Sequence, residues 1–274
     1  PHGLPLLLER VVERHQANTV ADTTTANVLI TAGATGALGA TVGATIDPGD
    51  EVLLIAPYWP LFAGIVQSFS GHPVAVPFIG VADSPETAVE ALDAKRTEHS
   101  VAIYLGTPNN PTGRVIPPAI VAAVVDWAQR HDLWIFADEV YEDYVYRGEH
   151  CYARALAPER TIYVTSASKC LAPGLRVAWV AAPPNLRPRL AEAARITTVT
   201  QPAVMGAIAS QWILEGWAET LLQWQRREIA ARFKIARQAL DGLDWRGHPS
   251  AFHVMLHLPP PWTGDIFAAA ARQA

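Results

Sequence analysis

The sequence predicts an α/β fold in which a mostly parallel central sheet is flanked by helices. Short apolar, β-rich segments alternate along the chain with stretches of helical patterning. Half of the 274 residues are hydrophobic and only 17% are charged, which is enough apolar material for a large buried core. Polar or glycine-rich segments follow several of the apolar runs, where ligand-binding loops lie in sheets of this kind.

Seven short segments have the composition of buried strands. Apolar and β-branched side chains dominate them, and helical patterns separate them, as parallel strands joined by helical crossovers require. We therefore expect the helices to cover both faces of one sheet. The predicted strands are Val28–Thr31, Glu51–Ala56, His72–Pro77, Val101–Leu105, Trp134–Ala137, Thr161–Thr165 and Val177–Ala181.

A long amphipathic pattern follows, from about Trp217 to Leu240, with apolar side chains at helical spacing among Arg and Glu. It predicts a helix that leads into a second domain. We expect a large domain over residues 1–222 and the start of a smaller, incomplete α+β domain over 223–274. The small domain is predicted to contain a strand at Ala251–Leu258 and a helix at Thr263–Ala274.

Charge and composition argue against several classes of protein. A formal net charge of −5 without a basic stripe predicts no nucleic-acid binding through this segment. The uncharged run from Val28 to Ile46 is broken by four glycines, so it predicts a strand, loop and helix rather than a membrane span. Two cysteines, Cys151 and Cys170, are too few for a disulfide framework, which favours a cytoplasmic protein. The nine histidines show no spacing typical of a metal site, and His253 and His257 alone are too few.

The segment Ser166-Ala167-Ser168-Lys169 is the first candidate for chemistry. The lysine comes just after an apolar strand, two hydroxyls precede it, and Arg176 follows seven residues later. A lysine amine can bind an aldehyde, while hydroxyls and a guanidinium can hold a phosphate. Taken alone, the segment is better explained as an ordinary surface lysine.

Asp138 and Asn110 each follow an apolar strand. A carboxylate is costly to bury unless it has a cationic partner, and a protonated ring nitrogen would be such a partner for Asp138. Asn110 could donate a hydrogen bond to a ligand oxygen, although Asn-Pro and Thr-Gly also build ordinary turns.

Two further segments could surround a flat, phosphorylated ligand. Ala34 and Thr35 lie where a strand passes into a helix, and free amides at a helix start bind phosphate well. The Gly33 segment matches neither a Walker loop nor a dinucleotide-binding motif. Trp59 offers an aromatic face after another strand; packing in the core is its simpler explanation.

Together, and in this order, these five segments resemble the class I/II aminotransferases, which are pyridoxal 5′-phosphate (PLP) dependent enzymes of fold type I. The resemblance covers nearly the whole chain. Within the family, the segment from Ala167 to Trp179 is most similar to 2-aminoadipate-type aminotransferases and to the effector domains of MocR-type regulators. Gly216–Glu219 and Leu256–Trp262 are similar to MocR-type effector domains as well.

The resemblance implies a role for each candidate around the cofactor ring. Lys169 would carry PLP as a Schiff base and then act as the general base of the reaction. Asp138 would pair with the pyridine nitrogen. Tyr141 and Asn110 would hydrogen-bond the phenolate oxygen, and Trp59 would stack on the ring.

The phosphate would be held, by the same resemblance, by four residues. These are Ala34 and Thr35 at the helix start, together with Ser166 and Arg176. The large domain would then be the PLP-binding domain. Ala178 stands where many relatives have glycine, a change that we attribute to packing.

The ends of the chain depart from the family pattern. Relatives usually have a tyrosine shortly before the segment seen here as Pro1-His2-Gly3, and an arginine for the substrate carboxylate in a late strand. That arginine would fall beyond Ala274, so we expect a longer protein or missing ends. The family also implies a homodimer whose subunits share the active site.

Two functions from different classes follow. The first is an aminotransferase that moves an amino group from an L-amino acid to a 2-oxo acid. The second is the effector domain of a MocR/GntR-type transcription regulator, which would have a DNA-binding winged helix before Pro1. A relative that has lost the cofactor is disfavoured, because Lys169, Asp138, Asn110 and Arg176 are all retained. Other PLP chemistries remain open, because fold and cofactor do not fix which bond breaks.

Overall fold

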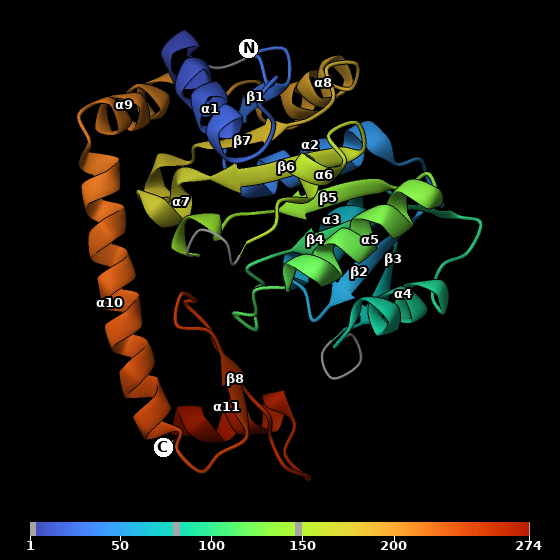
Figure 1. Ribbon diagram of the computed structural model, residues 1–274, viewed down its shortest axis with the longest axis vertical. Coiled ribbons are helices and arrows are strands. Elements are labelled where there is room, and N and C mark those ends of the chain that lie inside the picture. The colour runs from blue at the N-terminus through green and yellow to red at the C-terminus, as the bar shows by residue number, and fades with distance from the viewer. Residues whose placement is uncertain (1–3, 79–82, 146–149, 274) are drawn as a thin grey trace.

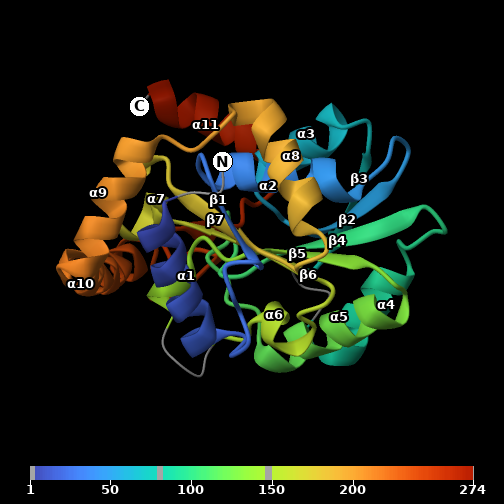
Figure 2. The ribbon, with the colours of Figure 1, turned by 90° about the horizontal axis from the view of Figure 1, so that it is seen from above.

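The computed structural model describes residues 4–78, 83–145 and 150–273, and it has the predicted α/β architecture. A seven-stranded sheet lies between two layers of helices, and one long helix leads from it to a small lobe (Figures 1 and 2). The segment Pro1-His2-Gly3 and Ala274 lie outside the described residues.

The sheet has the strand order β1-β7-β6-β5-β4-β2-β3. Strands β2 to β6 run parallel where they pair, whereas β7 is antiparallel to both of its neighbours, so that β1 and β6 run in the same direction. The prediction of a mostly parallel sheet is confirmed. Its strands are β1 (Val28–Thr31), β2 (Glu51–Ala56), β3 (His72–Pro77), β4 (Ser100–Gly106), β5 (Trp134–Asp138), β6 (Thr161–Ser166) and β7 (Ala178–Ala181).

Successive side chains of the central strands enter cores on opposite faces of the sheet. Ile103 and Ile135 pack into one core, whereas Tyr104 and Phe136 pack into the other. Both faces are therefore buried, which explains why these strands are nearly continuous apolar runs. On one face lie α2 (Ala34–Thr45), α3 (Pro60–Ser68) and α8 (Arg187–Thr198); on the other lie α4 (Pro85–Asp93), α5 (Pro118–Arg130) and α6 (Ala153–Leu156) (Figure 2).

A third core closes the β1 edge of the sheet. There α1 (Pro5–Asn18) and α9 (Ala203–Leu214) pack over β1 and β7, together with the short helices α7 (Ala167–Cys170) and η2 (Pro173–Leu175). This core places a short helix, α7, directly behind the end of β6.

The long helix and the small lobe follow. The predicted helix is α10 (Trp217–Ala239), and Leu222 on it packs with Tyr144 of the 3-10 turn η1 (Glu142–Tyr144). The lobe contains β8 (Trp245–Gly247), β9 (Val254–Leu256) and α11 (Gly264–Gln273). The strand predicted over Ala251–Leu258 is therefore shorter, and it pairs antiparallel with β8, a strand that the sequence analysis missed.

None of the helices within the described ranges is both long enough and apolar enough to cross a bilayer. The thiols of Cys151 and Cys170 are both free. Burial raises the pKa of the Cys170 thiol well above its usual value, which makes this cysteine a poor nucleophile.

His15 on α1 makes the fold sensitive to acid. Its side chain is buried against Tyr163, and burial, then the charges of Arg154 and Arg14, lower its pKa to about 3. A group whose pKa is lowered by folding stabilises the fold above its unfolded pKa of 6.5, and this contribution is lost as the pH falls from 6.5 towards 3.

We therefore expect His15→Phe to flatten the pH dependence of stability. In the native protein the free energy of unfolding should fall by up to about 1.4 kcal/mol per pH unit below pH 6.5 through this one group. Urea unfolding at pH 7.5 and at pH 5.0, with and without the substitution, measures the difference. Equal slopes in the two proteins would show that His15 is charged or exposed in the folded state.

Candidate functional site

The nine side chains predicted from the sequence line one pocket of about 180 Å³. They come from five separate segments, and Leu38, Val140, Ser168 and Pro173 complete the wall. The nine are Ala34, Thr35, Trp59, Asn110, Asp138, Tyr141, Ser166, Lys169 and Arg176.

The sheet explains this convergence. β1, β2, β4, β5 and β6 run in the same direction, so their carboxyl ends meet at one edge, and the pocket lies there. Ligand-binding side chains that are far apart in the sequence thereby become neighbours.

Asp138, the last residue of β5, is the acidic group of the pocket. Its carboxylate accepts a hydrogen bond of 2.6 Å from the Tyr104 hydroxyl and one of 3.3 Å from the Val140 N–H. Burial raises the pKa of Asp138, while these two hydrogen bonds and the charge of Lys169 oppose the rise. The carboxylate is thus oriented by two donors in a site that also favours a cationic partner.

Tyr104 was missed by the sequence analysis. It lies on β4, stacks on Phe62 with ring centroids 4.1 Å apart, and is nearly fully buried. The available signal was weak: a single tyrosine in an otherwise aliphatic strand, whose hydroxyl needs a partner when buried.

Lys169 and Tyr141 lie close together in the same pocket. Lys169 is carried by α7, its side chain is exposed, and its Nζ is 5.6 Å from the centroid of the Tyr141 ring. Burial, then the charge of Asp138, raises the pKa of Tyr141 to about 12, although a hydrogen bond with Asn110 acts in the opposite direction. Tyr141 is therefore a neutral hydrogen-bonding group at physiological pH.

A cradle of hydrogen-bond donors surrounds the start of α2. Gly33, the N-cap of α2, has φ +83°, and Arg176 follows η2 with φ +51°. The Arg176 guanidinium lies so close to Gly33 that a Cβ there would overlap it. The open N–H groups of a helix start and a guanidinium fork both favour phosphate oxygens.

Two serine hydroxyls border this cradle. Ser166 caps α7, with its Oγ accepting from the Ser168 N–H at 3.4 Å. The Ser168 hydroxyl is buried and has no hydrogen-bond partner within the described part of the chain. Such a group is free to bond a ligand or an ordered water. Ser168 was not assigned a role from the sequence, although it stands in the same motif as Lys169.

The donor set fits PLP. The lysine amine matches its aldehyde carbon, the buried Asp138 carboxylate matches a protonated ring nitrogen, and the α2 cradle with the orphaned Ser168 hydroxyl matches its phosphate. Trp59 borders the same pocket and offers a flat aromatic face.

We expect Gly33→Ala to weaken PLP binding at least tenfold. Alanine is strained at φ +83° by about 1–2 kcal/mol, and its Cβ displaces the Arg176 guanidinium. Gly36→Ala is the matched control, because Gly36 lies inside α2 with open space around it and alanine favours helix. A PLP titration followed by absorbance measures both affinities. Equal affinities in the two variants would remove Gly33 and Arg176 from the cradle.

The small lobe approaches the same pocket from outside. Phe252 and His253 lie with their ring centroids 5.7 and 5.3 Å from that of Tyr141. His257, in contrast, pairs with Asp244 at 3.3 Å, so the two histidines of this segment have different neighbours. No cluster of three metal-ligating side chains occurs in the described ranges. Phe252 and His253 were not predicted, because their contact with Tyr141 depends on the docking of the lobe.

Comparisons with known proteins bear on this site. The family model described as "Aminotransferase class I and II" matches residues 1–273. A probable aspartate/prephenate aminotransferase of Thermus aquaticus is 32% identical, covering 98% of this chain and 71% of the relative. The aspartate/prephenate aminotransferase of Thermus thermophilus is 30% identical with the same coverage. A solved single mutant of Thermus thermophilus aspartate aminotransferase superposes with a TM-score of 0.87 at 27% identity, over 99% of this chain and 72% of that one.

Proposed function

This chain belongs to the class I and II family of PLP-dependent aminotransferases, and on that premise we propose that its pocket moves an amino group from an L-amino acid to a 2-oxo acid with Lys169 as the PLP-bearing residue. The observation that carries the proposal is the meeting of Lys169, Asp138 and Arg176 in one pocket. The chain spans about 71% of the length of the two Thermus relatives.

Bound PLP supplies an electron sink that stabilises negative charge at the α-carbon of the amino acid. The residues around it have distinct tasks. Asp138, held by Tyr104 and Val140, would keep the ring nitrogen protonated. Tyr141 and Asn110 would hold the phenolate oxygen, and Trp59 would cover the ring face.

The phosphate anchor is the α2 cradle. The N–H groups of Ala34 and Thr35, the hydroxyls of Ser166 and Ser168, and the Arg176 guanidinium converge there. These groups would hold the phosphate of PLP.

Lys169 moves the proton. With the cofactor bound, the Lys169 amine would be the general base that takes the proton from the substrate α-carbon and gives it back. Lys169 lies on the short helix α7, which Ser166 caps.

The alternative of a regulator's effector domain is not favoured, because the relatives are aminotransferases. The similarity to 2-aminoadipate-type and MocR-type proteins remains a prediction. Relatives of comparable identity carry names with aspartate, arginine and kynurenine, so we propose an L-amino acid substrate without choosing its side chain.

We also propose a homodimer. Three apolar side chains around the turn between α8 and α9, Ile196, Val199 and Val204, are each about 70% exposed. Exposed apolar groups that gather in one segment are typical of interaction surfaces, and a second copy of the chain is the partner that we assign to this one. We further propose a cytoplasmic location, consistent with two free thiols, and a large domain that ends near residue 222, inside α10.

The test is an absorbance spectrum of the purified protein after addition of PLP and then of L-amino acids. A band of lysine-bound cofactor that is lost on adding an amino acid, with release of a 2-oxo acid, supports the aminotransferase. A band that changes without release of oxo acid supports a sensor. The absence of any band contradicts both.

A further inference from the structure

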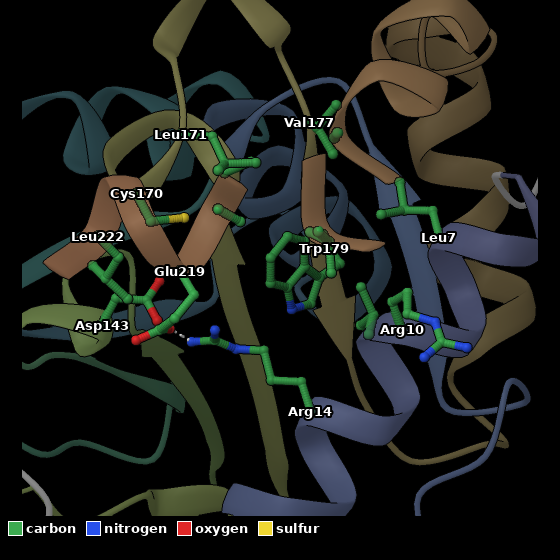
Figure 3. A pocket seen from close by; sticks show the side chains of 15 residues that line it. Leu7, Arg10, Arg14, Asp143, Cys170, Leu171, Val177, Trp179, Glu219 and Leu222 are labelled. Atoms are coloured by element: carbon green, nitrogen blue, oxygen red, sulfur yellow. Dashed lines mark hydrogen bonds and ion pairs between the residues drawn. The ribbon is translucent and has the colours of Figure 1, made fainter. Parts of the chain in front are cut away.

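The helix that carries Lys169 is short and lies between two pockets. α7 has four residues, and a cavity of about 220 Å³ lies behind it, with walls from α1, β7, α9 and α10 (Figure 3). Ala167, Cys170 and Leu171 line this cavity, whereas Ser168 and Lys169 line the cofactor pocket. Close packing alone therefore does not fix the position of α7, and specific bonds have to do so.

One such bond holds the backbone carbonyl of Lys169. The residue four positions further on is Pro173, which has no N–H, so this carbonyl has no helical partner. The hydroxyl of Tyr144, on η1, donates to it at 2.6 Å, and the Nε2 of Gln225, on α10, donates to it at 3.3 Å. The Oε1 of Gln225 also lies 2.9 Å from the Tyr144 hydroxyl. Because a phenol has one proton, the shorter contact indicates that this proton points mainly to the Lys169 carbonyl.

The Tyr144 side chain is held in place by its surroundings. Tyr144 is only 2% exposed, and its ring packs edge-on against that of Phe252, with centroids 4.6 Å apart. Burial raises the pKa of the Tyr144 hydroxyl well above its usual value. The hydroxyl therefore keeps its proton and remains a donor at neutral pH.

The turn η1 that carries Tyr144 is tied to two helices. Arg14 of α1 pairs with Glu142 at 2.7 Å and with Asp143 at 2.5 Å, and Figure 3 shows the second pair at the edge of the cavity. On the other side, the Nε of Arg226 on α10 donates to the carbonyl of Asp143 at 2.8 Å. Hydrogen bonds that involve charged groups are the stronger ones. η1 is thus fixed independently of α7, and it can serve as the support from which Tyr144 holds that helix.

Resting on the proposed function, in which Lys169 bears PLP, we propose that Tyr144 is a positioning residue for the reaction, whose hydroxyl fixes the backbone of Lys169 with the help of Gln225. Tyr144 does not line the cofactor pocket, so it acts through Lys169. With PLP bound, the lysine side chain is held at its far end as well, and a shift of its backbone would misplace the amine. A misplacement of about 1 Å in an active site costs on the order of 10²-fold in rate.

Two substitutions and a matched control test the proposal. Tyr144→Phe removes the hydroxyl and keeps the ring that packs against Phe252. Gln225→Leu removes the amide that bonds to the same carbonyl. Gln223→Leu is the control, because Gln223 is exposed on the same helix and donates to Glu219 instead.

Hydrogen exchange is measured first, on the full chain without PLP. In Tyr144→Phe the backbone amides of residues 167–172 should exchange about tenfold faster, because a hydrogen bond that holds α7 is lost. Gln225→Leu should show the same change at smaller size, and Gln223→Leu should show none. The amides of β4 should exchange as in the native protein, since β4 packs in other cores than α7.

Kinetics and PLP titration follow on the loaded protein. In Tyr144→Phe we expect kcat to fall by about 10- to 100-fold, while KM for the amino acid stays within about twofold. PLP affinity should fall by up to about tenfold, since the lysine no longer meets the cofactor in its native position. Gln223→Leu should leave all three quantities unchanged.

Native exchange of residues 167–172 in Tyr144→Phe, or a native kcat, would overturn the proposal. Faster exchange throughout the chain, β4 included, would show a merely structural role and would overturn it as well. If Tyr144→Phe does not fold, Gln225→Leu decides in the same way. The absence of a lysine-bound cofactor band in the native protein would instead contradict the proposed function, whereas the exchange measurement does not depend on PLP.

Discussion

Lys169→Ala is expected to abolish the absorbance band of lysine-bound PLP and to lower aminotransferase activity by about four orders of magnitude or more. The substitution removes both the amine that binds the aldehyde and the general base, and no other lysine among the described residues lines the pocket. The fold should survive, because the Lys169 side chain is exposed and alanine is the best helix former for a position in α7.

The control for this prediction is Lys234→Ala. Lys234 is an exposed lysine on α10 and does not line the pocket, so its loss should change neither the spectrum nor the rate. Absorbance, activity and circular dichroism are measured on both variants. A full band of lysine-bound cofactor in Lys169→Ala would mean that another amine carries PLP.

Asp138→Ala is expected to lower kcat/KM by about 10³-fold, against about tenfold for Asn110→Ala. The loss of Asp138 removes the charge that keeps the ring nitrogen protonated and leaves the buried Tyr104 hydroxyl without its acceptor. The loss of Asn110 would remove only one hydrogen bond, the one to the phenolate oxygen of the cofactor.

Asp138→Asn separates the two effects at this position. Asparagine keeps an acceptor for Tyr104 but cannot hold a proton on the ring nitrogen by charge. Activity in Asp138→Asn should therefore stay close to that of Asp138→Ala, while the free energy of unfolding should return towards that of the native protein. If Asp138→Asn were nearly as active as the native enzyme, the electrostatic role of Asp138 would be wrong.

The sheet was predictable because most of its strands are buried on both faces. Such strands are continuous apolar runs, and turn residues mark their ends, so most of the predicted boundaries fall within a residue of those observed. The same reasoning predicted the site. A reactive side chain at the carboxyl end of one parallel strand is expected to lie near the side chains at the carboxyl ends of the other strands. Lys169 and Asp138 were found in this way, 31 positions apart in the numbering yet lining one pocket.

The features that the sequence did not predict depend mostly on contacts between segments that are far apart in the chain. Tyr104 is part of the site only because its hydroxyl reaches Asp138 across two paired strands. The Arg14 guanidinium bonds to Glu142 and Asp143, far along the chain, and no local pattern signals that. The strand β8 is three residues long and mostly exposed, so it lacks the apolar run by which the other strands were recognised.

The assembly of the pocket from five segments at the sheet edge also affects how the protein folds and acquires its cofactor. Each wall comes from a different part of the chain, from Ala34 to Arg176, so a partly folded chain presents no complete binding site. A ligand that binds only the native state adds RT ln(1 + [L]/Kd) to its stability. The supply of PLP therefore selects correctly folded molecules, and vitamin-starved cells should contain less of this protein because its unliganded form is degraded faster.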